Sequence, residues 1–469
     1  MTFLGQFLDH DMTFDPTSSL ERQVDPEAIQ NFRNPLLELD SVYGSGPAPW
    51  PHLYDQSVDG QGIELLVEVN TGSTAFSANG FQRYDLPRNS QNTAILGDPR
   101  NDENLIVSQL HVAILKFHNA VEDHVRAELG PTLTGDVFAE AQRLVLWHYQ
   151  WIIVHEYLTK TVGKPMVDDI LENGRKFYKW RDAPYIPVEF SVASFRFGHS
   201  QVRPSYRPNF GTNPADLASR QFKLIFDDRL TDPEDPEDMR GGIRAPPRFI
   251  DWQTFFDFGD GRVRPNKLID TTLSTVLFDL PGRPSSEPQS LAQSNLLRNL
   301  TFSIPSGQAV AKAMGIPLLP ASKLKDLQPL HLHERTPLWF YLLRESEVKK
   351  DGKQLGPVGG RIVAEVFIGL LEGDGMSYLR QDPEWKPTLP LSPAENSRSP
   401  ACFASPEWWR HCDLKTLRMT RARRLDARLA HVQRSLGYET DSSSGRARHL
   451  ELNEVGANTT RVSEHRYSR

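Results

Sequence analysis

Three separated segments of this sequence place a histidine or an arginine among other polar residues, and two of the three also contain carboxylates. GQFLDHD contains His10, GDPRNDEN contains Arg100, and FRFGHSQV contains His199. Histidine exchanges protons near neutral pH, and its neutral ring binds metals. A fixed arginine can stabilise negative charge that develops during a reaction. The three segments together could therefore supply acid–base and metal chemistry.

Each segment taken alone also has a simpler interpretation. His10 could lie on the surface of an N-terminal loop. Asp102 and Glu103 could be ordinary acidic residues of a first helical turn, where they complement the helix dipole. His199 could be a buried core histidine with no metal. One segment by itself therefore predicts no activity.

Five strings occur together and in a fixed order: GQFLDHD, GDPRNDEN, FRFGHSQV, TPLWFYLL and LGPVGGRIVAEVFIGLL. In order and spacing they resemble the animal-type haem peroxidases, particularly the bacterial branch of that family. The resemblance runs from about residue 1 to about residue 390. It implies a mainly α, large single-domain fold with long loops and little β structure, which binds haem b.

The resemblance assigns one side of the haem to three residues. His199 would ligate the iron through its neutral imidazole. Asn295 would orient the second ring nitrogen of that imidazole, which sets its tautomer and basicity. Arg298 would pair with a haem propionate, since a planar guanidinium suits a carboxylate.

On the other side, the resemblance implies three catalytic residues. His10 would take a proton from hydrogen peroxide and return it to the leaving oxygen. Arg100 would stabilise the charge that develops as the O–O bond breaks. Gln6 matches a glutamine that orders water and halide beside the histidine.

Two carboxylates, Asp9 and Glu103, match residues that form ester bonds to haem methyl groups in the family. We therefore expect covalently bound haem. Asn104 stands where the most strongly oxidising members carry a methionine bonded to the haem. We expect hydrogen peroxide as oxidant and bromide, iodide, thiocyanate or small organic molecules as donors, in preference to chloride.

A calcium site follows from the same comparison. Asp11 would supply one oxygen, and the loop after it the others. If this loop is extended, alternate residues point the same way. Asn34, Glu38 and Asp40, with the backbone carbonyl of Leu36, would then offer the oxygen ligands that calcium prefers. The alternative is a solvated acidic loop.

Two departures and three rival functions accompany this resemblance. Residues 298–303, RNLTFS, lack an Arg, an Asp and a His of the family pattern, and the chain starts nine residues before His10. One rival is a haem protein that has lost turnover, and another is a cyclooxygenase-like fatty-acid dioxygenase. The latter needs a radical tyrosine, and residues 248–257 contain none. The third rival is an interaction protein that acts through residues 392–469.

Composition narrows the classes of function. The net charge of -7 provides no basic field for nucleic acid, and no apolar run is long enough to span a membrane. The two cysteines, Cys402 and Cys412, cannot form a disulfide framework. The first residues lack the features of a secretory signal, so we expect a cytoplasmic protein or a shortened chain that is otherwise secreted. Nothing in the sequence indicates an oligomeric state.

Long helices must position these residues. Apolar periodicity predicts helices over 103–129, 134–162, 187–201, 290–300, 305–314, 336–346 and 360–371, with few short strands. Thirty-five prolines indicate many long connections. We expect a catalytic domain over 1–390 and a polar, partly disordered extension over 391–469, with one amphipathic helix at 413–436.

Overall fold

The computed structural model describes the larger part of the predicted catalytic region. The described residues are 1–15, 30–57, 60–77, 80–129, 136–211, 239–257, 259, 261–280, 288–387 and 389. The predicted extension over 391–469 and its helix at 413–436 lie outside these ranges. The division at residue 390 therefore stays a prediction.

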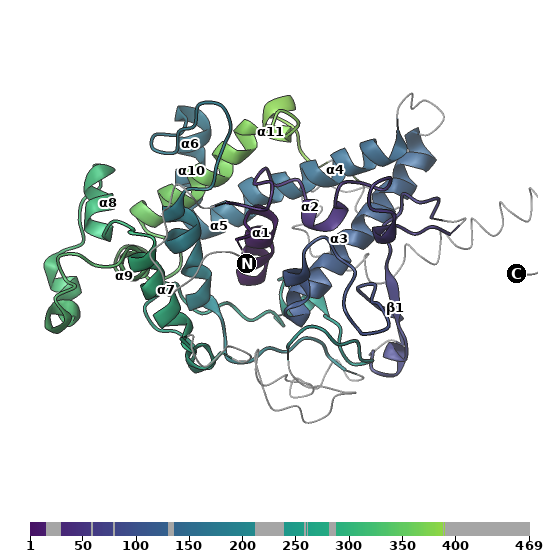
Figure 1. Ribbon diagram of the computed structural model, residues 1–469, viewed down its shortest axis with the longest axis horizontal. Helices are drawn as coiled ribbons and strands as arrows, with labels where there is room; N and C mark the ends of the chain where they lie inside the picture. The colour runs from purple at the N-terminus through teal and green to yellow at the C-terminus, as the bar shows by residue number, and fades with distance from the viewer. Residues whose placement is uncertain are drawn as a thin grey trace, which may run out of the picture. The chain divides into compact units, whose positions relative to one another are not determined.

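The chain begins with helix α1, Thr2–Met12, drawn in purple beside the N-terminus in Figure 1. Its Phe7, Leu8 and Met12 side chains are fully buried. Burying such side chains contributes about 1.5–3 kcal/mol each. The helix packs against α3 and against the segment that carries His199. The simpler interpretation of these residues as a surface loop was wrong.

Helices α3, Leu105–His124, and α4, Val137–Ile152, pack on each other where long apolar helices were predicted. Asn104 caps α3 by accepting a hydrogen bond from the Val107 N–H at 3.0 Å. Asp136 caps α4 in the same way. Such caps contribute about 1 kcal/mol each.

The second predicted helix continues beyond α4, but not as one regular helix. A π-helical segment, Ile153–Leu158, and the short α5, Thr159–Val162, follow it. Gly163, whose φ of +93° favours glycine, separates α5 from α6, Lys164–Asn173. The sequence did not predict α6.

The helix expected over 187–201 is not α-helical. It consists of a π-helical turn, Glu189–Ala193, and a 3-10 helix, Ser194–Gln201. Phe190 and Phe195 stack with ring centroids 4.8 Å apart, and both rings pack on Phe367. An α-helical period was predicted in error, because the π and 3-10 windings of this segment accompany its contacts with Phe367, which lies far away in the sequence.

The remaining predicted helices all form. They are α7 (Leu291–Thr301), α8 (Gly307–Ala313), α9 (Leu338–Lys350) and α10 (Pro357–Gly373). Helix α10 packs against α5, α6 and α9, and most of its apolar side chains are fully buried. Short elements complete the described chain: α2 (Asp40–Tyr43), α11 (Tyr378–Gln381), the π turn Val125–Leu129 and 3-10 turns at Pro51–Leu53, Ser73–Ala75, Pro99–Asp102, Trp252–Thr254, Thr275–Phe278 and Ala321–Leu330.

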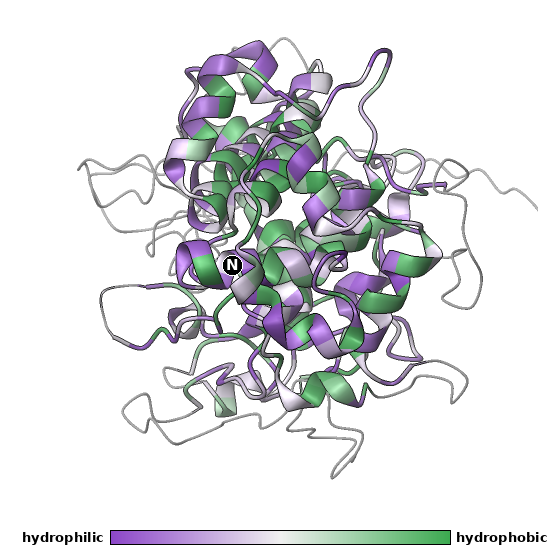
Figure 2. Ribbon diagram, turned by 90° about the vertical axis from the view of Figure 1, so that its left-hand side faces the viewer, coloured by the Kyte–Doolittle hydropathy of each residue, from purple (hydrophilic) through white to green (hydrophobic). Residues whose placement is uncertain are grey.

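Strand structure is scarce, as predicted. Strands β1, Glu68–Asn70, and β2, Arg83–Asp85, form an antiparallel pair in which Val69 lies opposite Tyr84. The fold is therefore mainly α. Figure 2 shows hydrophobic and hydrophilic residues alternating along the helices, as expected for helices that bury one face. Within the ranges described above, no helix combines the length and the apolar character that crossing a bilayer requires.

Candidate active site

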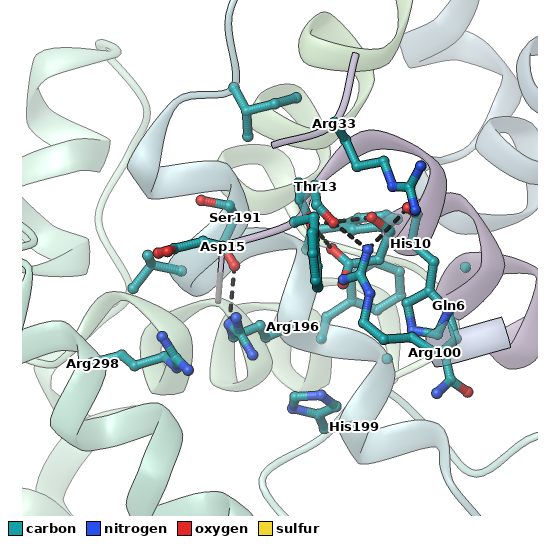
Figure 3. A pocket seen from close by; sticks show the side chains of 18 of the residues that line it. Gln6, His10, Thr13, Asp15, Arg33, Arg100, Ser191, Arg196, His199 and Arg298 are labelled. Atoms are coloured by element: carbon teal, nitrogen blue, oxygen red, sulfur yellow. Dashed lines mark hydrogen bonds between the residues drawn. The ribbon is translucent and has the colours of Figure 1, made fainter. Parts of the chain in front are cut away.

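A cavity of about 1220 Å³ lies between α1 and the 3-10 helix Ser194–Gln201. Figure 3 shows Gln6, His10 and Arg100 together on one side of it and His199 below them. Seven of the predicted site residues line this cavity: Gln6, Asp9, His10, Arg100, Glu103, His199 and Arg298. We use two names for the sides of this cavity. The His10 wall consists of α1 and the 3-10 turn Pro99–Asp102, which carries Arg100. The His199 wall consists of the 3-10 helix Ser194–Gln201 and α7.

Helical spacing places the residues of α1 in the cavity. Gln6, Asp9 and His10 stand three and four positions apart, so they share one helix face. Gly5 lies beside them, and a Cβ there would come within 2.6 Å of the Tyr157 hydroxyl. A glycine at this position therefore permits the close approach of Tyr157 to α1.

His10 is held by a buried amide that the sequence analysis did not identify. Its Nδ1 lies 2.9 Å from Asn101 Oδ1, and Asn101 Nδ2 lies 3.1 Å from His111 Nδ1. Burial lowers the pKa of His10, and the charge of Arg100 adds to this effect. His10 is therefore neutral near pH 7, the state that can accept a proton.

Glu103 joins Gln6 and Asn104 in one network beside His10. Gln6 Nε2 donates to Glu103 Oε1, and Asn104 Nδ2 donates to Gln6 Oε1 at 3.1 Å. The Glu103 side chain is 43% exposed and lines the cavity. Removal from bulk water raises the pKa of Glu103 to about 7, against the opposing charge of Arg100. Its oxygen lies 3.8 Å from His10 Nε2.

Arg100 lines the cavity but is anchored from behind. Its Nε and Nη2 donate to Asp98, and Nη2 also reaches the backbone carbonyls of His10 and Thr13. These contacts do not use Nη1. Burial alone would raise the pKa of Asp98, but hydrogen bonds from Arg100 and the charge of Arg33 hold it below its usual range. Asp98 thus fixes the guanidinium at the cavity wall.

On the His199 wall, the predicted pair of His199 and Asn295 lies in contact. Asn295 Nδ2 is 2.8 Å from His199 Nδ1, whereas its Oδ1 is buried with no hydrogen-bond partner. Rotating this amide by 180° would let Oδ1 accept a proton-bearing Nδ1. The other ring nitrogen, Nε2, would then be unprotonated and suited to a metal. The unpaired oxygen therefore fits a site completed by a metal-bound imidazole.

Two arginines lie on the same wall. Arg298, one turn after Asn295 on α7, lines the cavity. Arg196 lines it too, because residues three apart align on a 3-10 helix and Arg196 precedes His199 by three. Arg196 Nε donates to the Ser191 carbonyl at 2.9 Å. The sequence analysis missed Arg196, although its spacing from His199 could have revealed it.

The predicted calcium loop contacts Asp11, but it is not an extended stretch. Leu37 and Leu39 have φ values of +59° and +56°, and helix α2 starts at Asp40. The alternation argument for this loop was therefore wrong. Asp11 is buried and accepts hydrogen bonds from Tyr149, from the Leu39 N–H and from Ser41.

Negative charge accumulates in this region. Burial and the charge of Asp40 raise the pKa of Asp11 to about 7, and the pKa values of Glu38 and Asp40 are also raised. Arg33 offsets part of this charge, with Nη1 3.3 Å from Asp40 Oδ1. A cation would relieve the repulsion that remains.

The predicted calcium ligands do not all converge on one point. Asn34 is exposed and its amide nitrogen donates to Glu38, while the Leu36 N–H donates to Asn34 Oδ1. Among the residues described, one acidic triad has oxygens within 4.8 Å of one another, and its members are Glu64, Glu122 and Asp123. Asp11, Glu38 and Asp40 are farther apart than that.

Tyrosines also line the cavity, at positions the sequence analysis did not consider. Tyr157 and Tyr185 both contribute to its wall. Residues 248–257 contain no tyrosine, but these two tyrosines at other positions leave a tyrosine close to a cofactor in the cavity as an alternative.

Comparison with known proteins agrees with this geometry. Residues 25–224 match the family described as animal haem peroxidase. The chain is 25% identical over 302 residues to heme peroxidase 2 of Caenorhabditis elegans, which covers 60% of this chain and 40% of that protein. It is 26% identical over 307 residues to thyroid peroxidase of Canis lupus familiaris, covering 62% of this chain and 30% of that protein. The chain therefore spans less than half the length of these relatives.

Solved structures show the same fold. Peroxidase A of Dictyostelium discoideum superposes with a TM-score of 0.52 at 18% identity, covering 82% of this chain and 81% of that one. A fatty acid alpha-dioxygenase of Oryza sativa superposes with a TM-score of 0.52 at 15% identity, covering 80% of this chain and 68% of that one. These likenesses establish the architecture alone. The sequence match over residues 25–224 and the peroxidase relatives together support an assignment to the animal haem peroxidase family, whose members bind haem.

Proposed function

We propose that this protein is a haem peroxidase, which reduces hydrogen peroxide and oxidises halide, pseudohalide or small organic donors. The observation that carries the proposal is the pair of histidines on one cavity. His199 is paired through its Nδ1 with a buried amide, and His10 is neutral with Nε2 toward Glu103. One histidine is therefore suited to bind a metal and the other to move a proton.

The His199 wall would hold the haem. His199 Nε2 would ligate the iron, with Asn295 fixing the proton on Nδ1. Arg298, and also Arg196, would pair with the propionates, since both line the cavity. Bound haem would supply the electrons that reduce peroxide and would recover them from the donor.

The His10 wall would handle the protons. His10 Nε2 would accept the proton of the peroxide oxygen and then donate it to the departing oxygen, which leaves as water. Arg100 would stabilise negative charge through the side of its guanidinium that Asp98 leaves open. Gln6 would orient water or halide beside His10.

Asp9 and Glu103 would provide the ester bonds. Each carboxyl group would form one ester to a haem methyl group, a two-electron oxidation in which the methyl group and the carboxyl group each give up one proton. One hydrogen peroxide per ester would take up the two protons and two electrons and leave as two waters. The proposal is supported by the position of both carboxylates on the cavity wall.

Calcium would bind between Asp11 and the loop before α2. Asp11, Asn34, Glu38, Asp40 and the Leu36 carbonyl would supply the oxygens after the loop rearranges around the ion, because they do not converge on one point in this structure. The pKa of Asp11 is raised mainly by burial and also by the charge of Asp40, and a cation beside these two carboxylates would favour their charged forms. Since Asp11 follows His10 directly, the ion would stabilise the end of α1 that carries His10.

A fatty-acid dioxygenase is the second candidate, favoured by Tyr157 and Tyr185 on the cavity wall. One tyrosine, as a radical formed by oxidation with haem and peroxide, would take a hydrogen atom from the fatty acid. Dioxygen would add to the resulting carbon radical, and the tyrosine would return the hydrogen atom to give a hydroperoxide. Oxygen uptake with a long-chain fatty acid, lost in Tyr157→Phe or Tyr185→Phe, would favour it over a peroxidase.

The deciding experiment is an absorption spectrum of the full chain loaded with haem, followed by peroxide-dependent oxidation of iodide and guaiacol. We expect a Soret band, a spectral change on adding peroxide, and turnover of both donors. A protein that binds haem but neither reacts with peroxide nor turns over donors would refute the peroxidase proposal. Acid-acetone extraction then tests the esters, because linked haem stays with the protein.

A further inference from the structure

A hydrogen-bonded chain of three buried side chains leads away from the cavity behind His10. Asn101 accepts at Oδ1 from His10 Nδ1 at 2.9 Å, and its Nδ2 donates to His111 Nδ1 at 3.1 Å. His10 is 4% exposed, Asn101 is 0% exposed and His111 is 1% exposed. They come from three elements: α1, the 3-10 turn Pro99–Asp102, and α3. Water therefore does not compete for these bonds.

The amide at the centre of this chain is directional. Its oxygen can only accept a hydrogen bond and its nitrogen can only donate one. With Oδ1 toward His10, the proton of the His10 ring must sit on Nδ1. With Nδ2 toward His111, the Nδ1 of that ring must be unprotonated.

We infer that Asn101 is a positioning residue that fixes the tautomer of His10, so that Nδ1 carries the proton and Nε2 is the basic atom facing the cavity. The inference rests on the proposed function, in which His10 Nε2 accepts a proton from peroxide. The orientation of one imidazole proton thus depends on a side chain that does not line the cavity.

His111 fixes which atoms donate and which accept in this series of hydrogen bonds. Burial lowers the pKa of His111 to about 3, so its ring is neutral and carries a single proton. Its Nδ1 accepts from Asn101, which places that proton on Nε2. The ring also packs edge-on against Phe7 of α1, with centroids 6.1 Å apart.

The backbone around Asn101 restricts its movement. The Asn101 N–H donates to the Asp98 carbonyl at 3.1 Å, and the Asp98 side chain accepts from the Arg100 N–H at 2.9 Å. The anchor that fixes the Arg100 guanidinium therefore also fixes the turn that presents Asn101. Arg100 and His10 are positioned by one structural unit.

The direct test is the nitrogen NMR spectrum of the histidines in the full chain, in the reduced carbonyl form where haem is bound, because that form is diamagnetic. Signals are assigned with His10→Gln and His111→Gln. We expect His10 protonated at Nδ1 and His111 protonated at Nε2. The opposite tautomers, or averaging of both, would overturn the inference. A protein with the expected tautomers but no reaction with peroxide would contradict the proposed function alone.

Two variants at Asn101 separate positioning from packing. Asn101→Leu removes the acceptor, and we expect a mixture of His10 tautomers and a rate constant with hydrogen peroxide reduced about 10- to 100-fold. Asn101→Asp keeps an acceptor for His10, so the His10 proton should stay on Nδ1 while that of His111 moves to Nδ1. At about pH 8, where histidine is neutral, its rate should stay within a few-fold of the unmodified protein.

Asn209→Leu is the matched control, because Asn209 is equally buried and its amide bonds only to backbone elsewhere. It should leave the His10 tautomer and the peroxide rate unchanged. Equal slowing by Asn101→Leu and Asn101→Asp, with His10 unchanged in both, would show that Asn101 only packs.

Discussion

The two walls of the cavity differ in how completely their polar groups are paired. On the His10 wall, both ends of the Asn101 amide are hydrogen-bonded, and Asp98 holds Arg100. On the His199 wall, Asn295 uses one end of its amide and leaves Oδ1 buried without a partner. An unpaired buried oxygen of this kind costs about 1–3 kcal/mol.

This difference indicates which wall depends on the cofactor. The His10 wall is rigid through its own contacts, so it can hold a proton acceptor in place before anything binds. The His199 wall carries an uncompensated polar atom, which a metal on His199 would relieve by fixing the ring proton on Nδ1. Cofactor binding should therefore reorganise the His199 wall and leave the His10 wall nearly unchanged.

The largest effect is expected from His199→Ala, because it removes the only ring nitrogen that we assign to the metal. Haem retention should be lost, as measured by the Soret band after gel filtration. His52→Ala, at an exposed histidine, is the control and should retain haem. Full haem retention in His199→Ala would remove the basis for the comparison of the two walls.

The next effect is expected from His10→Ala, which removes the proton acceptor but no contact to the metal. Haem should be retained, and the rate constant with hydrogen peroxide should fall about 10²- to 10⁴-fold. Stopped-flow absorption measures both. Unchanged peroxide kinetics would mean that the proton is transferred by another group, such as Glu103.

A pH effect should arise on the His10 wall. Without calcium, the folded state binds a proton at Asp11 up to about pH 7, whereas the unfolded state releases it near pH 4. The folded protein holds more protons between these values, so the free energy of unfolding should fall as the pH rises through them, by up to about 4 kcal/mol.

Urea denaturation of the calcium-free protein at several pH values measures this effect. In Asp11→Asn the free energy of unfolding should fall less as the pH rises, whereas in the surface variant Asp168→Asn it should fall as in the unmodified protein. Calcium should restore stability most strongly above about pH 7, where the carboxylate is charged. An equal response to calcium in Asp11→Asn would place the ion elsewhere.

The smallest effect should come from Asn295→Ala. Removing the partner of His199 Nδ1 should weaken haem affinity about 10- to 100-fold without abolishing binding. Asn299→Ala, one turn along α7, removes an amide that bonds to the backbone of Ile304 and Leu338 and is the control. Equal weakening in both variants would show that the helix, and not the amide, matters.

Sequence reasoning predicted most of the helices but not all of their local geometry. Helices α3 and α10 could be predicted because their apolar periodicity is long and strong. The 3-10 helix carrying His199 was assigned the wrong period, since its winding depends on packing with Phe367. The calcium loop was expected to be extended, but Leu37 and Leu39 adopt left-handed backbone angles that no local pattern indicated.

The candidate site could be predicted in part. The family match covers residues 25–224, which include Arg100 and His199 but not His10 or Asn295. His10 and Asn295 were proposed from short strings. The structure places His10 on the cavity wall and Asn295 in contact with His199. Asn101 and His111 were missed because their role depends on contacts between elements far apart in the chain.

The sequence by itself determined the helical character, the family resemblance and the residue types available for the chemistry, because these depend on local order and composition. Only the tertiary structure decided which atoms pair: Oδ1 of Asn101 with His10, Asp98 with Arg100, and Asn295 with His199. Pairing depends on distances of about 3 Å between segments separated by up to about a hundred residues. Such distances result from packing, which residue order alone does not specify.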